Sequence, residues 1–207
     1  MKLKPPMTMM NFFIKSEGTW FSQHTVHHFD SPQNQSGKSN LIVKVLTKDD
    51  PKVIEVCEWQ KVNPALATGG ASLNWQDNLD NHEPNPNNAD IIVDIPNSTT
   101  GITGKFFYNR GYAKGIPVVG RYHFANDGVL TIDTEYEDNQ GQERCWFLTD
   151  DFRVRVSTLR IMNGVNLITY CSERRCITRK ELEEIVQKNA ARSLGNIVDS
   201  ELMKYKH

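Results

Sequence analysis

The sequence predicts a mainly β protein, an antiparallel up-and-down barrel of about ten strands with a few peripheral helices. Short runs that alternate apolar and polar residues recur along the chain, and this period of two is typical of β-strands. Tight-turn sequences such as Asn126-Asp127-Gly128 separate the runs, so neighbouring strands are expected to form hairpins. A two-sheet sandwich would fit the same pattern, but only a closed barrel removes the exposed strand edges. A barrel of about eight to ten strands can enclose one small ligand.

Two helices are predicted in the first part of the chain. The first follows Thr8, has Phe12 on its apolar side, and ends before Gly18. The second begins at Asp50-Pro51, where the aspartate is a good N-cap and proline suits the first helical position. The second helix interrupts an otherwise β pattern.

The remaining pattern predicts the strands, of which the last three form a meander. Residues 77–88, rich in Asn, Asp and Pro, are expected to form an irregular loop. The predicted strands are Thr19–Phe29, Lys38–Thr47, Ala71–Gln76, Ala89–Ile95, Gly104–Asn109, Pro117–Ala125, Val129–Glu137, Glu143–Leu148, Phe152–Ile161 and Val165–Cys171.

The pattern changes beyond Cys176, so we divide the chain into a barrel domain, residues 1–176, and a helical extension, residues 177–207. Thr178 and Glu181 form a capping box, and an apolar stripe at helical spacing runs from there to Leu194. This helix could dock a partner or pack against the outside of the barrel.

Charge and hydrophobicity exclude several classes of partner. The 24 basic and 25 acidic side chains give a net charge of −1 and form no basic run, so no nucleic acid partner is expected. No apolar segment approaches the roughly 20 residues of a membrane-spanning helix, and the N-terminus lacks a signal-peptide core. The protein is therefore expected to stay where it is made, without a membrane span.

A metal site is not expected either. His24 and His28 share one face of a predicted strand but stand about 13 Å apart, too far to bind one ion. The four cysteines follow no metal-ligand spacing and are expected to be reduced; they are Cys57, Cys145, Cys171 and Cys176.

The candidate site lies in the final meander. In the middle strand, period 2 puts Arg153, Arg155 and Ser157 on one face, and two guanidiniums side by side could hold a dianionic ligand. A solvated outer face is the alternative for such a pair. Because Glu143 and Glu173 lie near the ends of the flanking strands, acids and bases could share one concave surface. Trp146, between these glutamates in sequence, is expected to add an aromatic side chain to it.

Several segments together resemble the S-type phycobiliprotein lyases, also called CpcS/CpeS-like bilin lyases. The similarity runs over roughly residues 11 to 175, and the order and spacing of the motifs carry it. The motifs are NFFIKSEGTWFSQHTVHHFDSPQNQSGKS, NPALATGGASLNW, GYAKGIPVVGRYHF, ERCWF, RVRVS and CSER.

This resemblance implies a calycin-type, lipocalin-like barrel that binds a linear tetrapyrrole, phycoerythrobilin or phycocyanobilin, without a metal. The enzyme would assist thioether attachment of this bilin to a cysteine of a phycobiliprotein apo-subunit. His24 stands where the family pattern has Arg, which changes one basic contact. The residues that match the pocket of the family are Trp75, Glu143, Trp146, Arg153, Arg155, Ser157 and Glu173.

In that mechanism the two arginines would meet the bilin propionates, and a carboxylate would lie near the pyrrole nitrogens. Glu143 and Glu173 are the candidates for acid and base catalysis, with the assignment between them open. A non-catalytic tetrapyrrole carrier is the alternative function, and a homodimer stays open. The expected location is the cytoplasm of a cyanobacterium or a plastid stroma.

Overall fold

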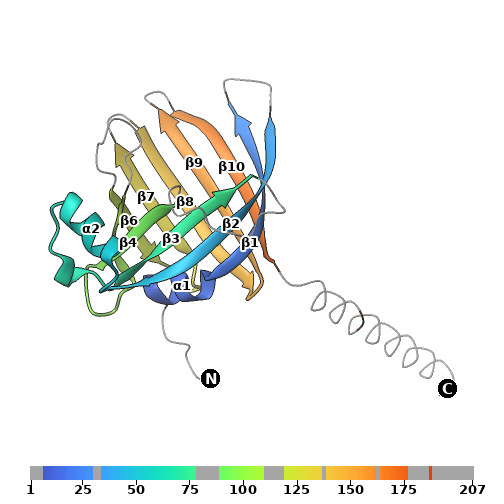
Figure 1. Cartoon of the computed structure of the whole chain (residues 1–207). Helices are drawn as coiled ribbons and strands as arrows, with labels where there is room; N and C mark the ends of the chain where they lie inside the picture. The colour runs from blue at the N-terminus through green and yellow to red at the C-terminus, as the bar shows by residue number, and fades with distance from the viewer. Residues whose placement is uncertain are drawn as a thin grey trace, which may run out of the picture. The chain divides into compact units, whose positions relative to one another are not determined.

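Ten antiparallel strands close into a barrel in the computed structural model of this chain (Figure 1). The structure describes residues 7–29, 34–77, 89–109, 119–136, 139–161 and 164–176, and residue 187. The elements are α1 (Met9–Ser16), β1 (Gly18–His28), β2 (Gln35–Thr47), α2 (Pro51–Trp59), the short 3₁₀ helix η1 (Pro64–Leu66), β3 (Gly69–Gln76), β4 (Asp90–Pro96), β5 (Thr103–Tyr108), β6 (Val119–Phe124), β7 (Leu130–Tyr136), β8 (Asn139–Thr149), β9 (Phe152–Ile161) and β10 (Gly164–Arg175).

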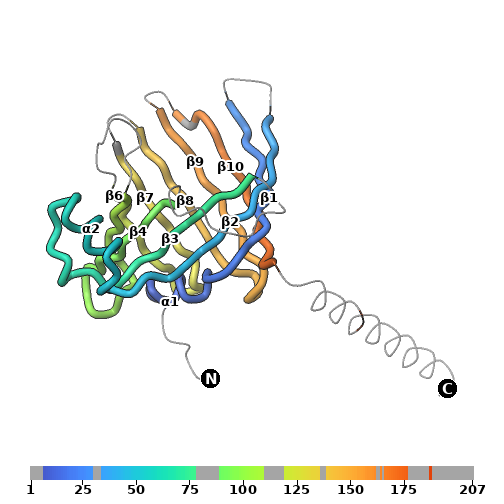
Figure 2. Tube along the Cα trace, in the orientation of Figure 1, coloured from blue at the N-terminus to red at the C-terminus, as the bar shows by residue number. Residues whose placement is uncertain are grey.

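Each strand pairs with the next one in sequence, and β1 closes the circle against β10. Figure 2 shows these two strands, blue and orange, side by side. In their register Ser22 lies opposite Glu173, so two residues far apart in sequence meet across the closing seam. The predicted up-and-down barrel is confirmed, since consecutive hairpins connect all the strands except β2 and β3, between which α2 and η1 intervene.

The two predicted helices begin where the sequence places them, each after a side chain that caps its first turn. The side chain of Thr8 accepts a hydrogen bond from the backbone N–H of Asn11, at 3.2 Å. Asp50 accepts one from the backbone N–H of Lys52, at 2.9 Å. Several strand ends differ from prediction, most of all at β8, which begins earlier, at Asn139, and at β10, which continues to Arg175. The predicted loop at 77–88, apart from its first residue, and the predicted C-terminal helix, apart from residue 187, lie outside the described residues.

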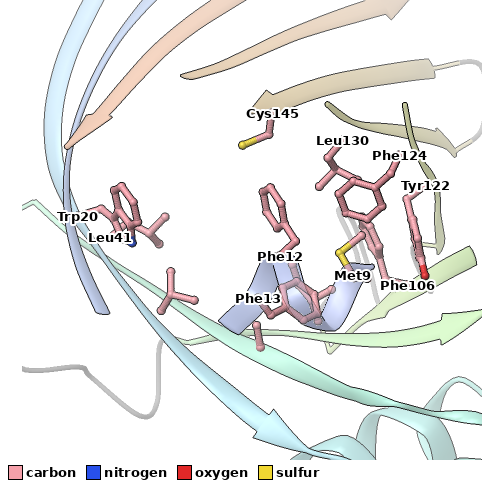
Figure 3. Packing of buried hydrophobic residues seen from close by; sticks show 13 residues of the cluster. Met9, Phe12, Phe13, Trp20, Leu41, Phe106, Tyr122, Phe124, Leu130 and Cys145 are labelled. Atoms are coloured by element: carbon pink, nitrogen blue, oxygen red, sulfur yellow. The ribbon is translucent and has the colours of Figure 1, made fainter. Parts of the chain in front are cut away.

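Helix α1 fills the barrel interior near the end where β1 begins (Figure 1). Its buried side chains are Met9, Phe12, Phe13 and Ser16. Figure 3 shows the aromatic side chains of α1 surrounded by side chains of the barrel wall. The ring of Phe12 packs against those of Phe124 and Phe147, with centroids 5.9 and 5.3 Å apart. This end of the barrel is therefore a closed apolar core.

A second core lies outside the barrel, where α2 packs on β4 and β5 through Val53, Val56 and Cys57. Helix α1 thus lies inside the barrel, and α2 lies on its outer surface.

The interior side chains toward the opposite end of the barrel remain partly exposed to solvent. We call this end the mouth and define it by the interior residues His24, Trp75, Tyr108, Glu143 and Ser157. The described residues contain no helix long and apolar enough to cross a membrane.

By its internal contacts the chain divides into two units, Met1–Arg175 and Cys176–His207. All the helices and strands named above belong to the first unit.

Candidate functional site

Strand β9 carries both arginines of the predicted pair into the barrel interior. Arg153 and Arg155 line an internal cavity together with apolar side chains of the core. The outward face of the strand instead carries Val154 and Val156. The alternative that the pair lies on a solvated outer face is therefore wrong.

The deeper arginine, Arg153, is held by neighbouring side chains and is only 4% exposed. Its Nε donates to Oε2 of Glu173, and its Nη1 donates to Oγ of Ser16 at 2.8 Å. Its guanidinium lies 4.6 Å from the ring centroid of Trp20. These contacts and its burial hold Arg153 beneath the mouth.

Glu173, the most buried carboxylate of the site, has no exposed surface. Its Oε2 accepts from Arg153, while its Oε1 accepts from Oγ of Ser22 at 3.3 Å and lies 3.0 Å from Nε of Arg155. Burial would raise the pKa of Glu173, but Arg155 and Arg153 and the hydrogen bonds from Arg153 and Ser22 outweigh it and lower that pKa below its ordinary value. Glu173 is therefore a fixed negative charge at neutral pH.

Arg155 lies one layer closer to the mouth. Its Nη1 is 3.3 Å from Oε2 of Glu143, and its guanidinium stands 5.1 Å from the ring centroid of Trp75. The contact of its Nε with Glu173 is an ion pair without the alignment of a hydrogen bond, so this N–H remains without a hydrogen-bond acceptor. Burial would lower the pKa of Arg155, but Glu143 and Glu173 raise it above its usual value.

Unlike Glu173, Glu143 is accessible to solvent, with 31% of its side chain exposed; the side chain of Arg155 is 20% exposed. The Glu143–Arg155 contact therefore lies at the boundary between the buried ionic network and the mouth. A ligand that enters the mouth can compete for this contact, whereas the Arg153–Glu173 pair lies beneath it.

Two other predicted residues complete the mouth. Ser157 lies on the same face of β9 as Arg155 and opposite Glu143 in the register with β8. His24 lies opposite Gly37 on β2 and Cys171 on β10. A Cβ atom at Gly37 would stand 2.5 Å from the His24 ring, so the glycine makes room for this imidazole.

Trp146 does not join this surface, which corrects the prediction that it shares one concave face with the glutamates. It lies between Cys145 and Phe147, both packed in the interior cluster, so the alternation of the strand turns Trp146 outward. On the outer face its register partner on β9 is Val154.

A cavity of about 80 Å³ lies between α1 and Arg155, with Trp75 and Tyr108 among its lining residues. Ligand pockets for whole small molecules typically measure about 300–1,000 Å³, so this cavity has room only for a small apolar group. The larger part of any organic ligand would have to lie in the mouth.

Two cysteines flank Arg155, Cys145 on β8 and Cys171 on β10. Burial raises the pKa of the Cys145 thiol to about 12, and burial also raises the pKa of Cys171 although Arg155 opposes this shift. Neither thiol is a ready nucleophile at neutral pH. Among the described residues no group of His, Cys, Asp or Glu side chains is arranged to hold a metal ion.

Sequence reasoning did not find three residues that hold the network together, Ser16, Trp20 and Ser22. Trp20 and Ser22 alternate with His24 on β1, so period 2 could have placed them on the same interior face. Ser16 continues the stripe of Met9, Phe12 and Phe13 along α1, but its contact with Arg153 spans most of the chain.

The family and the relatives that this chain resembles are all of the CpcS/CpeS type. Residues 8–176 match the model of a family described as CpeS-like protein. The chain is 81% identical over 193 residues to a chromophore lyase CpcS/CpeS 4 of Trichodesmium erythraeum, and the alignment covers 93% of this chain and all of the relative. A phycocyanobilin lyase subunit CpcS of Picosynechococcus is 36% identical over 81% of this chain and 85% of the relative.

A solved structure has the same fold. The S-type phycobiliprotein lyase CPES from Guillardia theta superposes with a TM-score of 0.68 over 84% of this chain and 95% of the other, at 23% identity. This likeness agrees with the closed antiparallel barrel that was expected from the sequence.

Proposed function

Since the chain belongs to the CpcS/CpeS family of chromophore lyases, we propose that it binds a linear tetrapyrrole in the mouth and catalyses its thioether attachment to a cysteine of a phycobiliprotein apo-subunit. Phycocyanobilin and phycoerythrobilin are the candidate pigments, and the name of one relative, a phycocyanobilin lyase subunit, favours the first. The proposed location is the cytoplasm of a cyanobacterium, because the curated relatives named above are cyanobacterial.

One observation carries this proposal. Arg155 lies at the inner end of the mouth, held from below by Glu173 and lying against the ring of Trp75. Its Nη1 meets the partly exposed Glu143, and its Nη2 lies 3.8 Å from Sγ of Cys171. A guanidinium in this position suits a propionate of the bilin, which would replace Glu143 as its partner. Arg153 is proposed to hold Glu173 rather than the second propionate, because it is buried and its Nε and Nη1 already donate to Glu173 and Ser16.

The same geometry suggests different roles for Glu173 and Glu143. Glu173 is buried and its pKa is lowered, so it is proposed to stay ionised and to orient the arginines. Glu143 would leave Arg155 when a propionate arrives and would then be free to face the pyrrole nitrogens. Glu143 is therefore the proposed acid–base group, which stabilises the protonated and more electrophilic bilin.

The reaction is an addition. The thiol of the acceptor cysteine adds across the ethylidene double bond, with sulfur bonding to the exocyclic carbon and the proton ending on the ring carbon, and nothing leaves. The protein contributes orientation, because a flexible pigment held by Arg155 and stacked on Trp75 presents one face to the thiol. The mouth is proposed to open toward the acceptor, since α1 fills the other end.

A direct experiment tests the proposal. The purified protein is mixed with phycocyanobilin or phycoerythrobilin and an apo-subunit, and the products are separated on a denaturing gel. Coloured, covalently labelled subunit that forms faster than in the absence of the protein supports a lyase. Binding of the pigment with no acceleration would instead support the carrier function.

A further inference from the structure

Ser16, the last residue of α1, is bonded directly to the buried arginine of the site. It is 2% exposed, and its Oγ accepts a hydrogen bond from Nη1 of Arg153 at 2.8 Å. Its backbone carbonyl accepts a second one from Nε1 of Trp20 at 2.7 Å. The other buried side chains of α1 are Met9, Phe12 and Phe13, so Ser16 is the point at which a largely apolar helix face meets the ionic network.

A second arginine fixes the end of α1 in place. Nη2 of Arg175 donates to the carbonyl of Lys15 at 2.8 Å, and its Nη1 donates to the carbonyl of Glu17. The guanidinium of Arg175 lies 4.3 Å from the ring centroid of Trp20, and that of Arg153 lies 4.6 Å from the same ring. The position of the Ser16 hydroxyl is therefore set by contacts on both sides of the helix end.

From Ser16 the contacts continue toward the mouth without a gap. Arg153 pairs with Oε2 of Glu173, and Oε1 of the same carboxylate lies 3.0 Å from Nε of Arg155. Because Arg153 and Glu173 are buried, neither can exchange its partner for water. If the Ser16 hydroxyl is removed, Nη1 of Arg153 becomes a buried donor without its acceptor, and the guanidinium must turn toward another one.

We propose that Ser16 is a positioning residue for bilin binding, which acts through Arg153 and Glu173 to fix the guanidinium of Arg155 at the inner end of the mouth. This inference rests on the proposed function and extends it to a helix on the far side of the ionic network. Helix α1 would then do more than fill the barrel, because its last residue, Ser16, sets the position of the arginine that contacts the bilin.

The test compares two hydroxyl deletions on the same helix. Ser16→Ala removes the contact with Arg153, whereas the control Thr8→Ala removes the N-cap of α1, whose Oγ1 accepts from Asn11, and leaves the network intact. With phycocyanobilin as the probe, Ser16→Ala is expected to weaken binding about tenfold and to broaden the absorption band of the bound pigment. Thr8→Ala is expected to lower the thermal midpoint while both the affinity and the band stay at their parent values.

A ligand-free measurement runs in parallel. In ¹⁵N-labelled protein the Nε–H resonances of Arg153 and Arg155 should move in Ser16→Ala and stay in place in Thr8→Ala. Ser16→Cys, which keeps a weak acceptor in nearly the same volume, should fall between Ser16→Ala and the parent, and it takes the place of Ser16→Ala should that variant fail to fold.

Equal effects of the two deletions on binding and spectrum would overturn the proposal, because they would mean that α1 acts only by filling the barrel. An unmoved Arg155 resonance in Ser16→Ala would overturn it as well. Failure of the parent protein to bind both phycocyanobilin and phycoerythrobilin would defeat the proposed function instead, and the resonances alone would then decide the role of Ser16.

Discussion

Glu173 and Arg153 form an ion pair inside the barrel, where 0% and 5% of their side chains are exposed. Glu173→Gln is expected to lower the free energy of unfolding by about 3 kcal/mol, because it leaves two arginines close together in the interior without their central carboxylate. Glu135→Gln is the matched control, since its pair with Arg121 at 2.7 Å is more than half exposed and should contribute less than about 1 kcal/mol. Urea unfolding of both variants measures the difference, and equal losses would contradict this account of the interior.

The pH dependence of the Glu173→Gln effect follows from the direction of the pKa shift. The pKa of Glu173 is lower in the folded state than its ordinary value, so its charge stabilises the fold fully above that ordinary value, about 4.3. This stabilisation is lost as the pH falls through the lowered folded-state pKa. The difference in unfolding free energy between the parent and Glu173→Gln should therefore be constant near neutral pH and shrink below about pH 4.3. A difference that grows on acidification would mean that Glu173 is protonated in the fold.

The two arginines should separate into a structural and a ligand-binding residue. Arg155→Gln is expected to weaken phycocyanobilin binding tenfold or more, because a charge-assisted hydrogen bond is worth about 1.5–3 kcal/mol, while Glu173 keeps its pair with Arg153. Arg153→Gln is expected to lower the urea midpoint more, since its side chain is buried against Glu173 and Ser16. Bilin titrations measure the affinity of both variants, and urea unfolding curves measure their stability. Arg153→Gln with parent stability but lost affinity would show that both guanidiniums bind the pigment.

Much of the fold could be predicted from the sequence because the pattern that identifies a β-strand lies within the strand and its adjoining turns. Alternation and turn residues depend on neighbours in the chain, and all ten predicted strands occur in the barrel. Both N-caps, Thr8 and Asp50, were likewise readable from a few residues. The strand ends were less accurate, as at β10, where the polar residues Ser172 to Arg175 continue the strand past its apolar part.

Alternation could not decide which face of β9 points inward. Its apolar face, with Phe152, Val154 and Val156, lies on the outside, and the charged face lies inside. The usual rule fails here because Glu143 and Glu173, on the neighbouring strands, supply partners that make buried guanidiniums tolerable. Such a pairing across strands is a property of the closed barrel and cannot be read from one strand. On β8, by contrast, period 2 itself puts Trp146 on the face opposite Glu143, which is the outer face.

The cysteines are expected to be dispensable for the chemistry. Burial raises the pKa values of Cys57, Cys145 and Cys171, so in the folded protein their thiols should react slowly with a thiol reagent at pH 8. Cys176, partly exposed after β10, should react first. A folded variant with all four replaced by Ala or Ser should still transfer bilin to an apo-subunit. A denaturant-resistant adduct of bilin on the lyase that transfer requires would reverse this expectation.

Glu143 is expected to distinguish a lyase from a carrier. Its carboxylate is partly exposed at the mouth and its one hydrogen-bond partner among the described residues is Arg155, so Glu143→Gln should change the stability by less than about 1 kcal/mol. The amide keeps the size of the side chain but removes the charge that stabilises a protonated bilin. Single-turnover transfer to an apo-subunit should therefore slow by about 10²- to 10⁴-fold, the usual contribution of a positioned acid–base group.

The bilin affinity of Glu143→Gln, measured beside its transfer rate, distinguishes a catalytic role of Glu143 from a role in binding. Glu143→Gln removes the carboxylate that competes for Nη1 of Arg155, while Glu173 stays beside its Nε, so a propionate should bind as tightly as before or more tightly. Glu135→Gln, the same chemical change on the outside of the barrel, should leave both rate and affinity unaltered. If Glu143→Gln transfers the pigment as fast as the parent, then the mouth only delivers the bilin, and the proton that activates it comes from the acceptor subunit or from water.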